Sequence, residues 1–266
     1  MTRIAVCGAA GRMGQRIIVS AIEAGCTVSG ALEYPGHPMI GQDAGLLAGC
    51  GPLGVLISDD SNAVVEGCDV LIDFTTPAVS LKNLELCGLK QKALVIGSTG
   101  FSKEERALAQ ELSKTVPCVL APNMSVGVNL CFKVLKDIAA TLGNDFDVEI
   151  VEMHHRLKKD APSGTAVRMG EVVAEALGRD YATVANCHRE GFTGERTDEE
   201  IGMQTVRGGD IIGEHTVYFI GMGERIELSH RAMTRDMFSR GSVRAAKWLV
   251  GKTPGLYDMQ DVLGLK

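Results

Sequence analysis

The sequence RIAVCGAAGRMG, residues 3–14, decides the fold of the first half of the chain. It opens with an apolar run typical of a buried strand, and three glycines at GxxGxxG spacing follow just before a helical pattern. Glycines in such a turn let a pyrophosphate approach the backbone at the start of the next helix. A glycine triplet alone is weak evidence, but its place between a strand and a helix favours dinucleotide binding.

Further short apolar runs continue this pattern through the first half of the chain. They occupy residues 27–33, 54–58, 69–74, 93–98 and 118–122, and amphipathic helical segments at 11–25, 77–90 and 103–114 lie between several of them. Continuous apolar strands alternating with helices are typical of a parallel sheet that is covered on both faces. We therefore predict an α/β, doubly wound, Rossmann-like domain.

The pattern changes after about Asn123. A long helical segment at 126–143 leads to a strand at 146–155 and, after a loop, to a second helix; the runs 203–210, 214–221 and 224–230 then read as a meander of antiparallel strands. A final helix is expected over 235–251. We predict a dinucleotide-binding domain from residues 1–125 with 236–266 and an α+β domain over 126–235, with a mobile, polar loop at 179–203.

Composition limits the possible partners. The chain has 266 residues, 45% of them hydrophobic, and a formal net charge of −6, which argues against binding to nucleic acid or to an anionic membrane surface. Its eight cysteines are scattered without a CxxC pair, which favours reduced thiols and no zinc site. We see no signal peptide and no apolar run that could span a membrane, so we expect a cytoplasmic protein.

The glycine turn and the acid after the second strand are the predicted cofactor site. Glu33 follows Gly14 by nineteen residues and is expected to accept hydrogen bonds from the adenosine ribose hydroxyls, which favours NADH. Tyr34 offers no cation to a 2′-phosphate, but Arg12 does, so the expected cofactor is NADH, NADPH or both. The predicted pyrophosphate contacts are Gly8, Ala9, Gly11, Arg12, Met13 and Gly14.

Two more loops follow the ends of predicted strands, where ligands bind in open α/β sheets. Phe74 and Thr75 lie in one loop, and Gly97, Ser98 and Thr99 lie in the other. These residues can line the nicotinamide half of the cofactor. The alternative is that the hydroxyl groups only cap helices, and for Thr75 the two interpretations have equal support.

The segment EMHHRLKKDAPSGTA, residues 152–166, predicts a site for an anionic substrate. It places His154 and His155 beside three cations in a chain of net negative charge. Ser163 can cap the next helix, whose free N–H groups around Gly164 and Thr165 suit a carboxylate. We expect recognition of a dianion together with proton transfer by histidine or lysine. The alternatives are a solvated loop and core histidines, and we interpret His188 and His230 as structural.

Several motifs together resemble the 4-hydroxy-tetrahydrodipicolinate reductases, also called dihydrodipicolinate reductases, of the diaminopimelate route to lysine. The motifs are GAAGRMG, VIGSTGF, APNMSVGVN, E-x-HHRLKKDAPSGTA, REGFTGER, VRGGDIIGEHTV and GLYDMQDVLGL, and they cover nearly the whole chain. The resemblance implies a Rossmann-like domain, a hinge, and a substrate domain whose sheet forms a homotetramer.

The resemblance also implies residue roles. His154 resembles the family's acid/base and Lys158 its proton donor, so these two are the expected catalytic residues. The match of APNMSVGVN adds Ala121, Asn123 and Met124 to the cofactor contacts. The positions that match substrate contacts are Thr99, His155, Lys158, Ser163, Gly164 and Thr165.

The sequence departs from the family pattern where it bears on cofactor choice. Many relatives carry a cation where Tyr34 stands, and some carry Arg where this chain has Thr76. Both departures favour NADH or dual use. Two rival hypotheses are a reductase of another substrate on the same plan and a non-catalytic NAD(H) sensor. Binding of pyridine-2,6-dicarboxylate separates them, because the sensor should show none.

Overall fold

The computed structural model describes residues 1–266, which form two compact units. The first unit joins Met1–Val126 to Asp236–Lys266, and the second is Gly127–Arg235. None of the helices combines the length and the apolar character that crossing a membrane requires.

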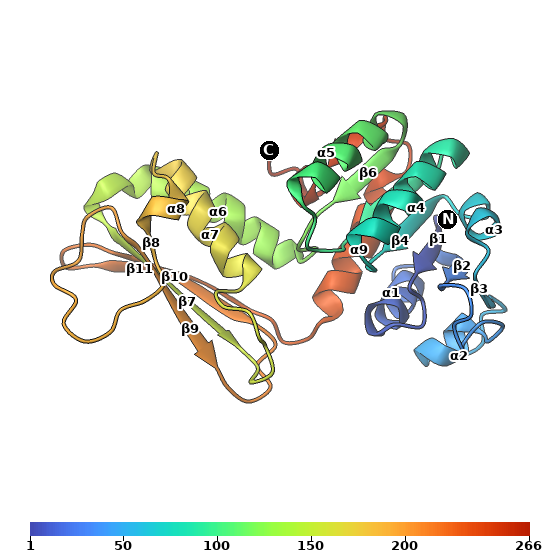
Figure 1. Ribbon diagram of the computed structural model, residues 1–266, viewed down its shortest axis with the longest axis horizontal. Helices are drawn as coiled ribbons and strands as arrows, with labels where there is room; N and C mark the ends of the chain where they lie inside the picture. Colours follow the sequence, from blue (N-terminus) through green and yellow to red (C-terminus); the bar gives the residue numbers. More distant parts are fainter. The chain divides into compact units, whose positions relative to one another are not determined.

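The first unit contains a seven-stranded sheet in the order β12-β6-β5-β4-β1-β2-β3, and every pair in it is parallel (Figure 1). This confirms the predicted doubly wound fold. The seventh strand was missed because it is short and carries no apolar run. The strands are β1 (Arg3–Cys7), β2 (Thr27–Leu32), β3 (Ile57–Ser58), β4 (Val70–Asp73), β5 (Ala93–Ile96), β6 (Pro117–Leu120) and β12 (Gly255–Tyr257).

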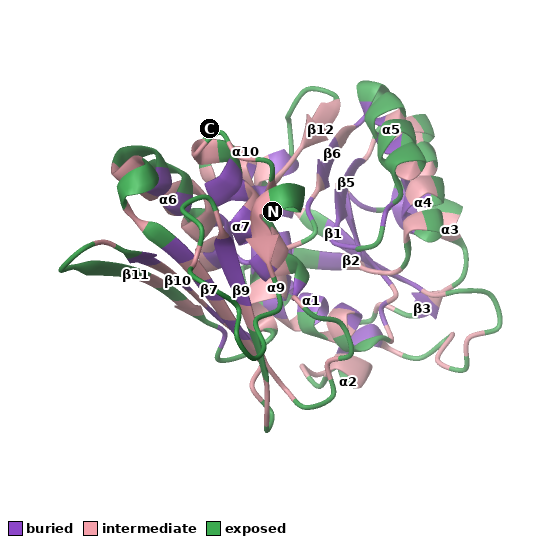
Figure 2. Ribbon diagram, turned by 60° about the vertical axis from the view of Figure 1, so that its left-hand side comes forward, coloured by how far each residue is buried: buried purple, intermediate pink, exposed green.

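Helices cover both faces of this sheet, and alternate strand residues pack against each layer. Ile4 and Val6 of β1 belong to the cluster with α1, α9 and α10, whereas Ala5 and Cys7 belong to the cluster with α3, α4 and α5. Figure 2 shows the inner strands of the sheet, such as β5, as buried and the edge strand β12 as intermediate. The helices are α1 (Arg12–Glu23), α2 (Ala44–Ala48), α3 (Ser61–Glu66), α4 (Pro77–Lys90), α5 (Lys103–Leu112), α9 (Asp236–Leu249) and α10 (Met259–Leu263).

The second unit contains a five-stranded sheet in the order β11-β10-β7-β9-β8. The helices α6 (Val126–Leu142) and α7 (Gly164–Ala176) pack on one face of it, around a core that includes Leu135, Met169 and Phe219 (Figure 1). The strands are β7 (Asp147–His154), β8 (Ala185–Asn186), β9 (Ile201–Arg207), β10 (Glu214–Ile220) and β11 (Arg225–Arg231).

The predicted antiparallel meander is only partly correct. β10 pairs antiparallel with β7 and β11, but β9 pairs parallel with β7 and β8. A parallel pair needs a crossover, and α7 supplies it between β7 and β9.

The predicted loop at 179–203 is also partly wrong. It contains a short helix, α8 (Tyr181–Val184), the strand β8 and the start of β9. Arg189 and Arg196 both form ion pairs with Glu149 of β7, so the polar stretch between β8 and β9 is tied to the sheet by charge.

Candidate active site

The register of the parallel strands gathers the predicted cofactor residues at one edge of the first unit. Cys7 lies opposite Leu32 on one side and Asp73 on the other, Asp73 lies opposite Ile96, and Ile96 lies opposite Leu120. The residue that follows each strand therefore reaches the same carboxyl edge, where open α/β sheets bind ligands. Those residues are Gly8, Glu33, Phe74, Gly97 and Ala121.

The glycine turn brings α1 very close to the end of β1. Gly8 has a positive φ of 69°, and a Cβ placed on Gly14 would lie 2.1 Å from the carbonyl oxygen of Gly8. Gly11 is the N-cap of α1, and no side chain caps that helix. The N–H groups of its first turn are therefore the donors that suit a phosphate.

Other N–H groups of the turn are used within the protein. Those of Gly8 and Ala9 both donate to the carbonyl of Leu32, and that of Gly11 donates to the carbonyl of Gly8. The backbone donors that remain for the predicted pyrophosphate contact are those at the start of α1, including the N–H groups of Arg12 and Met13. Ala9 is fully buried, so its side chain packs in the core beneath the turn and does not face a ligand.

Glu33 is held beside the turn by its own side chain. Its Oε1 accepts a hydrogen bond of 2.9 Å from the N–H of Ala10, which leaves carboxylate lone pairs for ribose hydroxyls. Tyr34, the next residue, is 63% exposed and carries no positive charge that could bind a 2′-phosphate here. The acid and the glycine turn, which the sequence predicts to form one cofactor site, thus lie together.

The two loops beyond β4 and β5 are rigidly supported. The buried carboxylate of Asp73 accepts hydrogen bonds from the N–H and the hydroxyl of Thr75, at 2.8 and 2.6 Å, and one from Asn83. The Ser98 hydroxyl lies 2.8 Å from that of Ser80 and is buried, so it braces its loop. Thr99 is exposed.

The remaining cofactor candidates lie at different depths. Gly97 is packed so tightly under Phe74 that an added Cβ would lie 2.2 Å from the ring. The side chains of Ala121 and Met124 are in the hydrophobic core, at 3% and 1% exposure, so only their main chains are available to a ligand. Asn123 uses its side-chain oxygen to accept a hydrogen bond from Ser125.

In the second unit, His154 stands at the end of β7 with its ring directed by Glu152. Its Nδ1 lies 2.6 Å from Oε2 of Glu152, two residues earlier on the same face of the strand. Burial alone would raise the pKa of Glu152, but hydrogen bonds from His154, Arg207 and Ser163 outweigh it and lower the pKa to about 2. The carboxylate is therefore charged at neutral pH.

Lys158 and His155 occupy the loop that follows. The ammonium of Lys158 lies 2.9 and 2.8 Å from the two carboxylate oxygens of Asp160, and the lysine side chain is 19% exposed. Nδ1 of His155 is buried without a hydrogen-bond partner. The Lys158 ammonium has a third N–H for an incoming anion, whereas Nδ1 of His155 is closed to solvent.

Ser163 is used by the protein itself, which weakens its predicted contact with substrate. Its hydroxyl caps α7 by accepting from Ala166 and lies 2.9 Å from Nε2 of His215, and its N–H donates to Glu152. Gly164 lies exposed at the first position of α7, followed by Thr165. The start of this helix fits a carboxylate better than the serine hydroxyl does.

Sequence reasoning missed three residues of this cluster, Glu152, Arg207 and His215. Glu152 and His154 have the period-2 spacing that places them on one face of a strand, which could have identified the acid. Arg207 and His215 lie on other strands, and only the register of the sheet brings them here. His230 lies opposite His215, and His188 is exposed beside Glu190.

We expect the stability of the protein to fall as the pH decreases from about 6.5 to 4. Burial and the nearby His154 lower the pKa of His215 from 6.5 to about 4, so the unfolded chain takes up a proton that the folded chain excludes. The expected loss is about 2–3 kcal/mol. Urea unfolding from pH 4.5 to 7.5 should show a shallower dependence in His215→Asn than in wild type, while the exposed control His188→Asn should match wild type. Equal slopes in all three would contradict the assignment.

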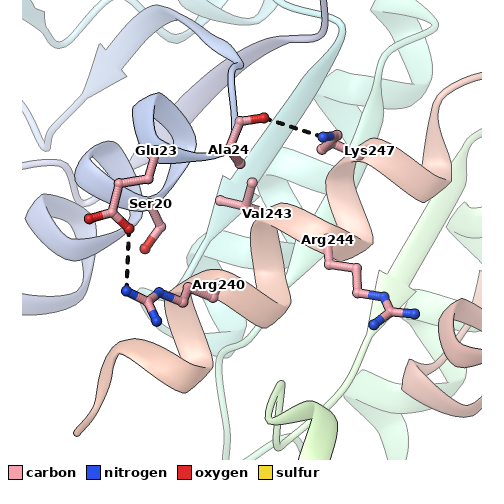
Figure 3. Close-up of a pocket in the computed structure, with 7 residues that line it drawn as sticks. All are labelled: Ser20, Glu23, Ala24, Arg240, Val243, Arg244 and Lys247. Atoms are coloured by element: carbon pink, nitrogen blue, oxygen red, sulfur yellow. Dashed lines mark hydrogen bonds and ion pairs between the residues drawn. The ribbon is translucent and has the colours of Figure 1, made fainter.

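A hollow elsewhere in the first unit is not the predicted site. It has a volume of about 400 Å³ between α1 and α9, and Figure 3 shows Arg240 and Lys247 reaching Glu23 and the carbonyl of Ala24 across it. None of the predicted cofactor residues lines it. It lies at the C-terminal end of α1, whereas the glycine turn is at the N-terminal end.

Comparison with known proteins covers both units. The family described as "Dihydrodipicolinate reductase, N-terminus" matches residues 2–124, and "Dihydrodipicolinate reductase, C-terminus" matches residues 127–263. Two relatives named 4-hydroxy-tetrahydrodipicolinate reductase, from Trichlorobacter lovleyi and Geobacter sulfurreducens, are each 83% identical over 266 residues, with 100% of both chains covered.

Solved structures agree with the fold. A dipicolinate-bound dihydrodipicolinate reductase from Paenisporosarcina sp. TG-14 superposes with a TM-score of 0.76 at 25% identity, covering 98% of each chain. An amine dehydrogenase from Mycobacterium smegmatis reaches a TM-score of 0.59 at 16% identity, covering 96% of this chain and 94% of its own, and shares the fold alone.

Proposed function

The chain belongs to the dihydrodipicolinate reductase family, and from this we propose that it reduces 4-hydroxy-tetrahydrodipicolinate to tetrahydrodipicolinate with NAD(P)H, on the diaminopimelate route to lysine. The observation that carries the proposal is the 83% identity, over the full length of both chains, to relatives named for this reaction. The paired cluster of His154 and Glu152 beside a basic loop supports it independently.

The first unit fits a dinucleotide. A side chain at Gly14 would collide with the Gly8 carbonyl, the start of α1 has no side-chain cap, and Glu33 is fixed at the edge of the turn. When bound, the dinucleotide supplies the hydride that the reduction requires. The start of α1 would hold the pyrophosphate, and the loops with Thr75 and Thr99 would line the nicotinamide half.

The second unit supplies charge and protons. Lys158, His155 and the start of α7 at Gly164 and Thr165 would bind the two carboxylates of the substrate; Thr99 joins these contacts on the family resemblance alone. Nδ1 of His154 is hydrogen-bonded to Glu152, so Nε2 is the nitrogen that would give and receive the proton. Lys158 is paired with Asp160 in the structure and would turn toward the substrate when it acts as the proton donor.

Glu33→Ala should raise KM for NADH by about 10-fold or more and change KM for NADPH far less. A hydrogen bond to a charged acceptor is worth about 1.5–3 kcal/mol, and NADPH already carries a phosphate where Glu33 would contact the hydroxyl. Initial rates with each cofactor measure the split. An equal rise in both KM values would refute the role of Glu33 in favouring NADH.

We also propose that the chain forms a homotetramer in which the open face of the second sheet is the contact surface between subunits, as the family resemblance implies. Val206 and Ile220 are 41% and 38% exposed there, on a face that no helix of this unit covers. Light scattering of the purified chain tests this assembly. The eight unpaired cysteines, five of them buried, suit the reducing cytoplasm in which we expect the enzyme to work.

The activity is tested by loss of reduced-nicotinamide absorbance. The substrate is made in the cuvette from pyruvate and aspartate semialdehyde by the preceding condensing enzyme, and NADH is compared with NADPH. Oxidation that depends on the condensing enzyme supports the proposal. No oxidation by folded protein that still binds NADH would favour another reductase or a sensor, and binding of pyridine-2,6-dicarboxylate would then exclude the sensor.

A further inference from the structure

A single buried carboxylate organises the end of β7. Glu152 is 1% exposed, and its oxygens are surrounded by donors from three parts of the second unit. Arg207 donates to both oxygens, at 2.7 and 2.8 Å, in the two-pronged geometry that makes such pairs strong. The N–H of Ser163 and the hydroxyl of Thr205 donate to Oε1, at 3.0 and 3.3 Å, and Nδ1 of His154 meets Oε2 at 2.6 Å.

This arrangement determines which nitrogen of His154 carries the proton in the neutral ring. An ionised carboxylate has only acceptors, so the short contact requires an N–H on Nδ1. Nε2 is then the nitrogen that can take up a proton. Gly213 leaves space at that nitrogen, since an added Cβ would lie 3.0 Å from Nε2.

Arg207 extends the arrangement to the basic loop. It lies opposite His154 in the parallel pair of β7 and β9, and its Nη2 also donates to the carbonyl of Asp160 at 2.7 Å. Ser163 at the far end of the loop is held by Glu152 itself. The pair Glu152–Arg207 therefore forms hydrogen bonds to the loop that carries Lys158 at two points, Asp160 and Ser163.

We propose that Glu152, together with Arg207, is the positioning pair of the active site, holding the His154 ring with Nδ1–H inward and Nε2 toward the substrate. This inference rests on the proposed function of His154. Neither residue of the pair needs to touch the substrate, because the pair acts through His154 and through the backbone of the loop.

Glu152→Gln is the sharpest test, because it keeps the shape and removes an acceptor. Arg207 donates to both oxygens, so the amide nitrogen disrupts one of its two hydrogen bonds in either orientation. In place of Oε1 the nitrogen would also face the N–H of Ser163, whereas in place of Oε2 it faces the His154 ring, where Nδ1 can become an acceptor; the second orientation is therefore favoured. We expect the neutral ring to change from the Nδ1–H to the Nε2–H form, seen in ¹⁵N spectra of histidine-labelled full-length protein assigned with His154→Gln. We expect kcat to fall by about 100-fold or more, as when an imidazole loses its orienting carboxylate, with KM for NADH unchanged.

Controls separate positioning from general support of the fold. Thr205→Val removes only the longest of the hydrogen bonds and should keep both the Nδ1–H form and kcat. Glu152→Asp should recover part of kcat, because it keeps the charge. A purely structural role predicts lower thermal stability in Glu152→Gln with the ring form and kcat unchanged, and that result would overturn the proposal.

The wild-type spectrum keeps the test decisive if Glu152→Gln does not fold. An Nε2–H form of His154 in wild-type protein would refute the positioning role without any variant. Failure of the proposed function looks different: wild-type protein would show the Nδ1–H form and no substrate-dependent oxidation of NADH.

Discussion

Lys158→Ala is expected to lower kcat by about 100- to 10,000-fold, the range typical for loss of a positioned proton donor. Lys158 is the least exposed cation of the basic loop, with 19% of its side chain exposed. A substrate carboxylate would take the place that the carboxylate of Asp160 occupies in the structure. His154→Gln should cause a loss of similar size, because Gln cannot transfer the proton. Steady-state rates with saturating NADH measure both.

The neighbouring cation provides the matched control. Lys159 is exposed, so Lys159→Ala should keep kcat within about 2-fold if only Lys158 acts on the substrate. Near wild-type turnover in Lys158→Ala and in His154→Gln would remove both from the catalytic assignment. Equal losses in Lys158→Ala and Lys159→Ala would mean that the loop contributes only its overall charge.

Gly14→Ala is expected to abolish useful cofactor binding and to destabilise the first unit by about 3 kcal/mol, at the upper end of typical overpacking costs. The new Cβ would lie 2.1 Å from the Gly8 carbonyl oxygen and 2.7 Å from Cα of Ala9, and both atoms are backbone that cannot rotate away. Either β1 or α1 must shift, and the shift would move the first-turn N–H groups away from the proposed pyrophosphate position. Fluorescence titration with NADH and urea unfolding measure the two effects.

Gly67→Ala is the control for this substitution in the same unit. Its φ is −76°, and an added Cβ would find ordinary contact, 3.5 Å from the nearest atom. It should bind NADH as wild type does and be as stable or up to about 1 kcal/mol more stable. If Gly14→Ala also bound NADH normally, the close approach of α1 to β1 would not be what forms the phosphate site.

Local patterns predicted the elements well where one residue type dominates. The apolar runs at 3–8 and 93–98 became β1 and β5, because a strand buried on both faces has to be apolar throughout. The run at 54–58 shrank to Ile57–Ser58, because Gly54 has a φ of +71° and Leu56 forms an isolated antiparallel bridge with Asp43. β12 has only three residues, Gly255–Tyr257, and joins the sheet only through its pairing with β6.

The sequence by itself determined the doubly wound domain, and it predicted the glycine turn with Glu33 as the cofactor site and the segment from His154 to Thr165 as the site of anion binding and proton transfer. These follow from composition and spacing within short stretches, where the chain's own geometry sets what can meet. Only the tertiary structure decided that β9 runs parallel to β7, that Ser163 serves its helix and His215, and that Glu152 is held by Arg207. Residues 152, 207 and 215 are far apart in the chain, and strand register, which depends on packing of the whole sheet, is what places their charges together.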